Sequence, residues 1–111
     1  MRRPNRLHDR HGLIRRRPLA KADLIEIYRV IARDNPVAAQ NYLYGLEATL
    51  KTLADSPEMG NVRFKNHPTI RVFVYRSHLI IYQPLIHPSG IDIVRVLHSA
   101  RDWISVIDPT A

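Results

Sequence analysis

Two stretches of helical periodicity, separated by only a few residues, constrain the fold of this chain most strongly. In the first, apolar side chains at i, i+3, i+4 and i+7 share one face of a helix over roughly 20–33. They are Leu24, Ile27, Tyr28 and Ile31. The second stretch begins at Asn35-Pro36, because Asn accepts hydrogen bonds from free amides at a helix start and Pro suits the first helical position. It ends at Ser56-Pro57, and its apolar positions are Ala39, Tyr42, Leu43, Leu46, Leu50 and Leu53.

The short connection predicts an antiparallel helical hairpin with one shared apolar face. Its cover comes from the segments TIRVFVYRS, LIIYQPLI and IDIVRVLH, which are rich in β-forming residues and separated by turns. We expect three antiparallel strands there and an edge strand at 13–17, ended by Pro18. The fold class is α+β: a helical hairpin packed on a small, twisted, antiparallel-type sheet, in the order β-α-α-β-β-β. We expect Tyr75 and Tyr82 to bury their rings on this sheet while their hydroxyls reach polar partners.

The 111 residues have the size of a single domain and include no cysteine, which excludes disulfides and thiolate sites. Most of the net charge of +7 lies in residues 1–17, with seven arginines against one aspartate. Residues 18–111 hold ten Lys and Arg against nine Asp and Glu. This division predicts a basic extension over 1–12, of a composition typical of disordered segments, a domain over 13–103 and a tail over 104–111. Direct contact with nucleic acid would come through the basic extension.

No stretch of the sequence has the length and apolar character of a membrane span or a signal-peptide core, so a cytoplasmic location is expected. Apart from His98 at the end of the last predicted strand, the histidines lie in predicted turns beside Pro or Ser (His67, His78 and His87) or in the basic extension, without a nearby carboxylate cluster. Glycine-rich phosphate loops are absent as well. We therefore predict neither a metal nor a cofactor.

The stretch LAKADLIEIYRVIARDNPVAAQNYLYGLEATLKTLADSPEMG, the arginine of TIRVF, the LIIY strand and the closing RVLHSARD together resemble the ParE toxins. These form a branch of the RelE/ParE superfamily of type II toxin–antitoxin systems, and the resemblance covers about residues 13–103. It implies a growth-arresting toxin that a cognate antitoxin neutralises. ParE-type members are associated with inhibition of DNA gyrase, whereas RelE-type relatives cleave messenger RNA on the ribosome.

Cleavage of RNA without a metal needs a proton donor and acceptor, together with cations that stabilise the charged phosphorus. If the chain is such an endoribonuclease, Arg71, Arg95 and His98 are the candidates. Strand alternation, however, places Ile91, Ile93, Arg95 and Leu97 on one face and Asp92, Val94, Val96 and His98 on the other. RelE-like nucleases also tend to have a catalytic tyrosine or histidine near the C-terminus, where this chain reads ARDWISV. A binding toxin is therefore favoured over an enzyme, with no catalytic residue preferred.

The sequence offers two sets of candidate binding residues, one for the target and one for an antitoxin. The candidates for contact with the target are Arg71, Arg95, His98, Arg101, Asp102 and Trp103. Arg71 and Arg95 equally suit structural ion pairs with Asp92 or Asp102. The candidates for contact with an antitoxin are Leu24, Ile27, Tyr28, Ile31, Tyr42 and Leu46, and either a groove along the helical hairpin or an open sheet edge would accept an extended partner.

The apolar residues that follow the last strand, Trp103, Ile104, Val106 and Ile107, either pack back on the core or meet a partner. Three functions remain open at this point. The chain is a gyrase-inhibiting toxin, a ribosome-dependent endoribonuclease, or an antitoxin-binding family member with weak toxicity.

Overall fold

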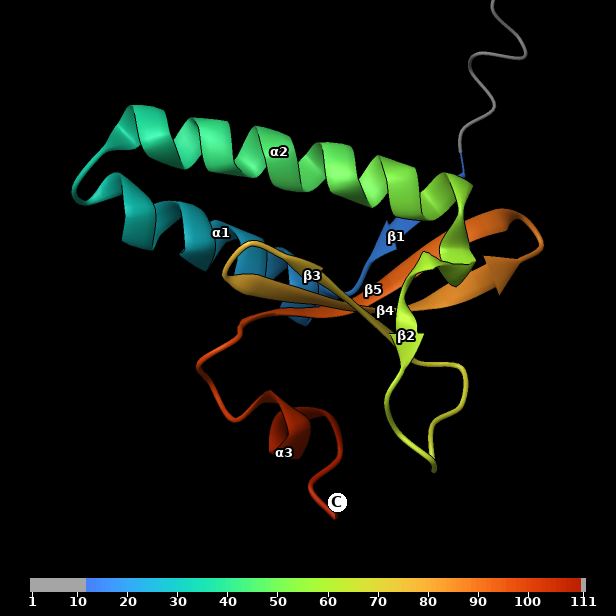
Figure 1. The fold of residues 1–111 in the computed structure, drawn as a ribbon. Coiled ribbons are helices and arrows are strands. Elements are labelled where there is room, and N and C mark those ends of the chain that lie inside the picture. Colours follow the sequence, from blue (N-terminus) through green and yellow to red (C-terminus); the bar gives the residue numbers. More distant parts are fainter. Residues whose placement is uncertain (1–11, 111) are drawn as a thin grey trace, which may run out of the picture.

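The computed structural model describes residues 12–110, so the predicted basic extension lies outside the described residues except for Gly12. A helical hairpin covers one face of a five-stranded sheet, and a short C-terminal helix lies on the other face (Figure 1). The elements are β1 (Leu13–Arg16), α1 (Pro18–Ala32), α2 (Pro36–Asp55), the 3-10 turn η1 (Pro57–Met59), β2 (Asn61–Val62), β3 (Arg71–Tyr75), β4 (His78–Ile86), β5 (Ser89–His98) and α3 (Trp103–Ile107).

Both long helices begin with a proline in their first turn. Pro18 was expected to end the first strand, but it is the first residue of α1, which therefore starts earlier than predicted. A proline fits there because the first helical amides have no partner within the helix. α2 begins as predicted, with the Asn35 side chain accepting a hydrogen bond from the Ala38 amide at 3.0 Å.

The strand order in the sheet is β1-β5-β4-β3-β2. β1 is an edge strand, as predicted, and it runs parallel to β5, whereas the other three pairs are antiparallel. The sheet is thus mixed: the last three strands are antiparallel, as predicted, and β1 adds one parallel pair. The sequence also gave no signal for β2, which has two exposed residues and pairs only with Arg71 and Val72.

Each face of the sheet carries its own apolar cluster. On the helix face, Leu24, Leu46, Leu50 and Leu53 pack against strand residues that include Tyr82 and Ile93. The opposite face, called the helix-free face below, is covered by the segment after β5. Trp103, Val106 and Ile107 pack back there on Phe64, Ile81 and Leu97, whereas Ile104 stays 43% exposed.

β5 carries one extra residue in its pairing with β4. Ile81 lies opposite Arg95 and Tyr82 lies opposite Ile93, so Val94 has no opposite residue. Such a bulge reverses the alternation of side chains in the part of the strand that follows. The prediction of strict alternation is therefore wrong beyond Val94. The helix face of β5 consists of Ile91, Ile93, Val96 and His98.

Arg95 and His98 still lie on opposite faces, as predicted, because the bulge shifts both of them. Arg95 lines a groove with Val106 and Ile107 on the helix-free face, whereas His98 lines a groove with residues of α1.

The Tyr82 hydroxyl lies inside the core, as expected. It accepts a hydrogen bond from the Gly60 amide at 2.8 Å and donates one to the Pro57 carbonyl at 2.7 Å. The approach is so close that a Cβ on Gly60 would come within 2.6 Å of this hydroxyl. Tyr82 thus ties the turn after α2 to the central strand β4, and both hydrogen bonds are buried.

Substitution of Tyr82 by Phe should lower the free energy of unfolding by about 1–3 kcal/mol, because a buried amide and a buried carbonyl each lose their partner. Urea denaturation followed by circular dichroism measures the change. Tyr44→Phe is the matched control, since its side chain is 66% exposed, and it should change stability by less than about 0.5 kcal/mol. Equal stability of the two variants would contradict the structural role of Tyr82.

Candidate functional site

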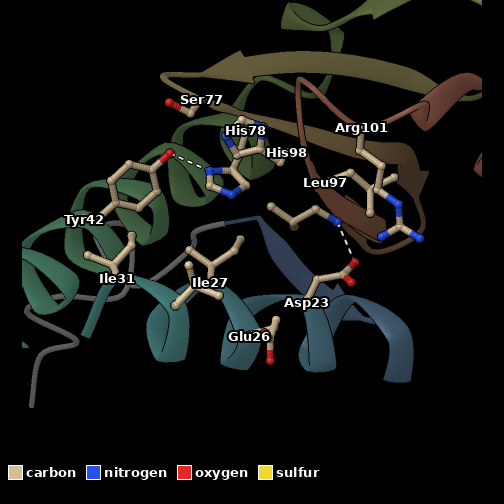
Figure 2. A pocket seen from close by; sticks show the side chains of 12 residues that line it. Asp23, Glu26, Ile27, Ile31, Tyr42, Ser77, His78, Leu97, His98 and Arg101 are labelled. Atoms are coloured by element: carbon tan, nitrogen blue, oxygen red, sulfur yellow. Dashed lines mark hydrogen bonds between the residues drawn. The ribbon is translucent and has the colours of Figure 1, made fainter. Parts of the chain in front are cut away.

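A groove of about 400 Å³ runs between α1 and the adjacent ends of β4 and β5 (Figure 2). We call it the helix groove. Its apolar lining comes from both long helices and from β5: Ile27, Val30, Ile31, Tyr42, Val96 and Leu97. Val30 is 48% exposed, so an apolar surface remains accessible between the helices and the sheet. An amphipathic segment of a partner fits such a site, because apolar side chains on one of its faces would find cover there.

Three rings form the end of the helix groove nearest the β3–β4 turn. The Tyr42 hydroxyl lies 2.7 Å from Nδ1 of His78, and the His78 and His98 ring centroids are 5.1 Å apart, edge to face. The two histidines face each other because they are paired across β4 and β5. His98 is exposed, and its Nδ1 accepts a hydrogen bond from the Ala100 amide at 3.0 Å.

His78 is the residue in this group that sequence reasoning placed wrongly. It was assigned to a turn, but it is the first residue of β4 and only 9% exposed. The two-residue turn Arg76-Ser77 is the signal that would have found it, because such a turn makes His78 the first paired residue of β4, opposite Tyr75. Burial, with a smaller contribution from His98, lowers the pKa of His78. Burial also raises the pKa of Tyr42, so both groups are neutral near pH 7.

The two walls of the helix groove differ in charge. Asp23 and Glu26 come from α1, whereas His98 and Arg101 come from the end of β5 and the turn after it. In Figure 2 the Arg101 side chain extends over the groove from the β5 side. A partner segment that is basic along one edge and acidic along the other would therefore complement both walls.

Asp23 also binds Arg95 across the edge of the sheet. Its carboxylate accepts hydrogen bonds from Nε and Nη2 of Arg95, at 2.8 and 2.9 Å, and from the Val96 amide at 2.9 Å. The Arg95 side chain is only 16% exposed, and the hydrogen bond to Asp23 raises its pKa. Sequence reasoning expected Asp92 or Asp102 as the partner, and the structure shows Asp23 instead.

Arg71 likewise has different partners from those expected. Its guanidinium donates hydrogen bonds to the carbonyls of Gly60 at 2.7 Å and Glu58 at 3.2 Å, and so braces the turn after α2. Asp102 accepts a hydrogen bond from the Ser105 amide at the start of α3. The Trp103 ring packs edge to face on Phe64 and lies under the Arg63 guanidinium.

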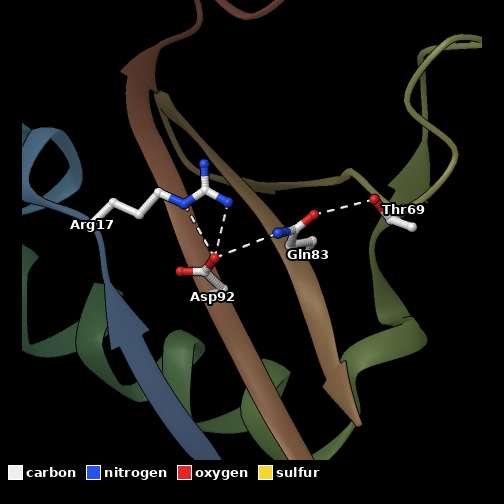
Figure 3. Close-up of polar contacts among 4 residues, drawn as sticks. All are labelled: Arg17, Thr69, Gln83 and Asp92. Carbon is white, nitrogen blue, oxygen red and sulfur yellow. Dashed lines mark hydrogen bonds and ion pairs between the residues drawn. The ribbon is translucent and has the colours of Figure 1, made fainter.

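Asp92 is held by Arg17, whose Nε and Nη2 lie 3.1 and 3.0 Å from one carboxylate oxygen (Figure 3). Gln83 contacts the same oxygen at 3.5 Å, and Thr69 in turn donates to Gln83. The other oxygen of Asp92 is buried and has no hydrogen-bond partner among the described residues. The network lies on the helix-free face, since Asp92 alternates with Ile91 and Ile93 of the helix face.

The three candidates for RNA cleavage therefore do not meet. His98 lies at the helix groove, Arg95 is bound to Asp23, and Arg71 is bound to two carbonyls. Of the six target-contact candidates, only His98 and Arg101 line the helix groove.

The antitoxin-contact candidates fall into three groups. Ile27, Ile31 and Tyr42 line the helix groove, and Tyr28 is 43% exposed but does not line it. Leu24 and Leu46 are buried in the core, at 8% and 0% exposure, so a partner reaches them only if the core opens. Within residues 12–110, we find no group of three or more His, Asp or Glu side chains placed to hold a metal ion. The described helices are also too short or too polar to cross a membrane.

The lowered pKa of His78 predicts a pH dependence of stability. Below its ordinary pKa of about 6.5, the unfolded chain takes up a proton that the folded chain does not, so the free energy of unfolding falls as the pH drops from 7 toward 5. His78→Gln should flatten this slope, whereas His87→Gln, at an exposed position, should keep it. Urea denaturation at several pH values measures the difference. A slope that His78→Gln leaves unchanged would refute the assignment.

Comparison with known protein families matches residues 14–103 to the family described as the ParE toxin of the type II toxin–antitoxin system parDE. A search of curated proteins gives no match. The family match covers most of the chain, from β1 to the start of α3, and agrees with the resemblance seen in the sequence. The observed order of helices and strands is that of a RelE/ParE-like fold. This chain belongs to the ParE toxin family of type II toxin–antitoxin systems.

Proposed function

We propose that the chain is a cytoplasmic toxin that arrests growth by binding DNA gyrase and inhibiting it, and that a cognate antitoxin neutralises it. ParE-family toxins pair with antitoxins. The observation that most favours an inhibitory binder over an RNA-cleaving enzyme is the separation of Arg71, Arg95 and His98. A ribonuclease needs its proton-transfer group and its phosphate-binding cations around one reacting phosphate.

The fixed guanidiniums strengthen this argument. Arg95 is held by a carboxylate at two nitrogens, and Arg71 is held by two backbone carbonyls. Moving either one to a phosphate would leave a largely buried carboxylate or a strand-end turn without its partner. The balance of charge points the same way, because residues 18–111 are nearly neutral and offer little for a broad phosphate-binding surface.

The helix groove is the proposed site for the antitoxin. Three antitoxin-contact candidates line it, and its exposed apolar floor lies between walls of opposite charge. A helical or extended segment with apolar side chains on one face would bury them there.

The first test separates gyrase inhibition from RNA cleavage. Purified protein should block supercoiling of relaxed plasmid by gyrase, and His98→Ala should inhibit within about threefold of the unchanged chain. Were the chain a ribonuclease that uses His98, the same substitution would lower mRNA cleavage in a translating extract by about 10²–10⁴-fold. Cells expressing the toxin should filament with damaged DNA.

Each of the alternative functions has its own outcome in these assays. mRNA cleavage that depends on His98, with gyrase unaffected at micromolar excess of toxin, would replace the proposal with the endoribonuclease. Normal growth on expression without the antitoxin, again with gyrase unaffected, would identify a weakly toxic antitoxin-binding member.

The second test addresses the antitoxin site. Val30→Lys places a charge on the apolar floor of the helix groove and should weaken binding of the cognate antitoxin at least tenfold, because a buried apolar contact is lost and a cation is desolvated. Isothermal titration with the co-expressed antitoxin measures this change. Val37→Lys is the control, since Val37 is 65% exposed on α2 and lies outside the groove. Equal affinity of both variants would place the antitoxin elsewhere.

A further inference from the structure

A second groove, of about 420 Å³, lies on the helix-free face, between the β1–α1 junction and α3. We call it the α3 groove. Ile70, Val94, Val106 and Ile107 give it an apolar lining, and Pro18 and Leu19 form the wall at the start of α1. Leu19 is 60% exposed, so this wall of the groove is accessible to a partner.

Two arginines line the α3 groove, and a third lies on the same face of the sheet. Arg17 and Arg95 line it, and Arg15 shares its face because Arg15 lies opposite Asp92 in the pairing of β1 with β5. Arg15 is exposed and forms no ion pair with any described residue. Arg17 and Arg95 each use Nε and Nη2 on an aspartate, so the third nitrogen of each guanidinium has no protein partner among the described residues.

Two of the three arginines are ion-paired, Arg17 with Asp92 and Arg95 with Asp23, so the unpaired positive charge on this face is that of Arg15. Asp92 has 8% of its side chain exposed, and Asp23 opens onto the helix groove instead of the α3 groove. An apolar groove with free guanidinium nitrogens at its rim complements an acidic side chain flanked by apolar ones. Nucleic acid fits less well, because its phosphates gain nothing from an apolar floor.

We propose that the α3 groove is the surface with which this toxin holds gyrase, and that its occupant is a gyrase segment carrying an acidic residue between apolar residues. This inference rests on the proposed function and adds the location and chemistry of the contact. The helix groove and the α3 groove lie on opposite faces of the sheet, as α1 and α3 do in Figure 1. The toxin thus has separate surfaces for antitoxin and target.

The test is a double substitution with a closely matched control. Arg15→Glu with Leu19→Glu reverses an exposed charge on the same face of the sheet and places a charge on the groove wall. Lys51→Glu with Val37→Glu makes the same changes on α2, where Val37, like Leu19, is the second residue of its helix and is 65% exposed. Neither control residue lines either groove. Thermal melts followed by circular dichroism verify that both variants fold.

The concentration of toxin that half-inhibits gyrase should rise at least tenfold for Arg15→Glu with Leu19→Glu and stay within about twofold for the control. Both variants should bind the antitoxin like the unchanged chain. Arg15→Lys with Leu19→Met, which keeps the charge and the apolar area, should inhibit within about twofold of the unchanged chain. Gyrase affinity should also weaken as salt is raised, because part of the attraction is between charges.

Three outcomes would overturn the proposal in distinguishable ways. If the unchanged toxin does not inhibit gyrase, the proposed function fails and the assignment of this surface fails with it. If the unchanged toxin inhibits but both double variants inhibit equally well, gyrase binds elsewhere and the proposed function stands. If Arg15→Glu with Leu19→Glu loses binding only to a 20-base-pair DNA duplex measured without gyrase, the surface holds phosphates and not a protein segment.

Discussion

The carboxylate of Asp23 secures the junction on which both faces of the molecule depend. β1 ends opposite Ile93, so beyond that point β5 has no neighbouring strand on this side. α1 lies beside β5 there, and the Asp23 carboxylate accepts hydrogen bonds from the Val96 amide and the Arg95 guanidinium. A largely buried pair of this kind is costly to break, because the remaining partner keeps its charge without compensation. The end of β5, which contributes residues to both grooves, is therefore held by β4 on one side and by a helix on the other.

This junction explains how so small a domain can present two separate surfaces. β5 lies inside the sheet and sends side chains to both faces, and its bulge puts Val94 and Arg95 on the same face. It therefore contributes Val96 and His98 to one groove and Val94 and Arg95 to the other. The helical hairpin completes the first groove, and α3 completes the second. Because the rigid sheet separates them, a partner bound on one side leaves the other side accessible.

The helices and the central strands could be predicted because their signals are local. The capping residue Asn35 and the spacing of Leu46, Leu50 and Leu53 depend only on neighbouring residues, and the structure confirms the helical hairpin. β2 could not be found, since two exposed residues without apolar alternation give no such signal. Local patterns also could not predict the parallel pairing of β1 with β5, because this pairing joins segments more than seventy residues apart.

In the candidate site, too, only the features with local sequence signals could be predicted. His98 and Arg101 were singled out from their place after the last strand, and both line the helix groove. The partners of Arg95 and Arg71 were assigned wrongly because an ion pair depends on tertiary contacts: Asp23 lies 72 residues from Arg95, and the carbonyls that hold Arg71 belong to a turn. His78 and Tyr42 were not recognised as one unit because they meet only when α2 packs over the β3–β4 turn.

The bulge at Val94 reverses which positions of β5 face the helices. Before it, odd-numbered residues of β5 point toward the helices, and after it even-numbered residues do. The same amino acid at the same position would therefore lie on a different surface in a relative that lacks the one extra residue. Equivalence between family members at positions 95–98 has to be established by counting from the bulge, and a shared histidine in an alignment does not by itself imply a shared environment.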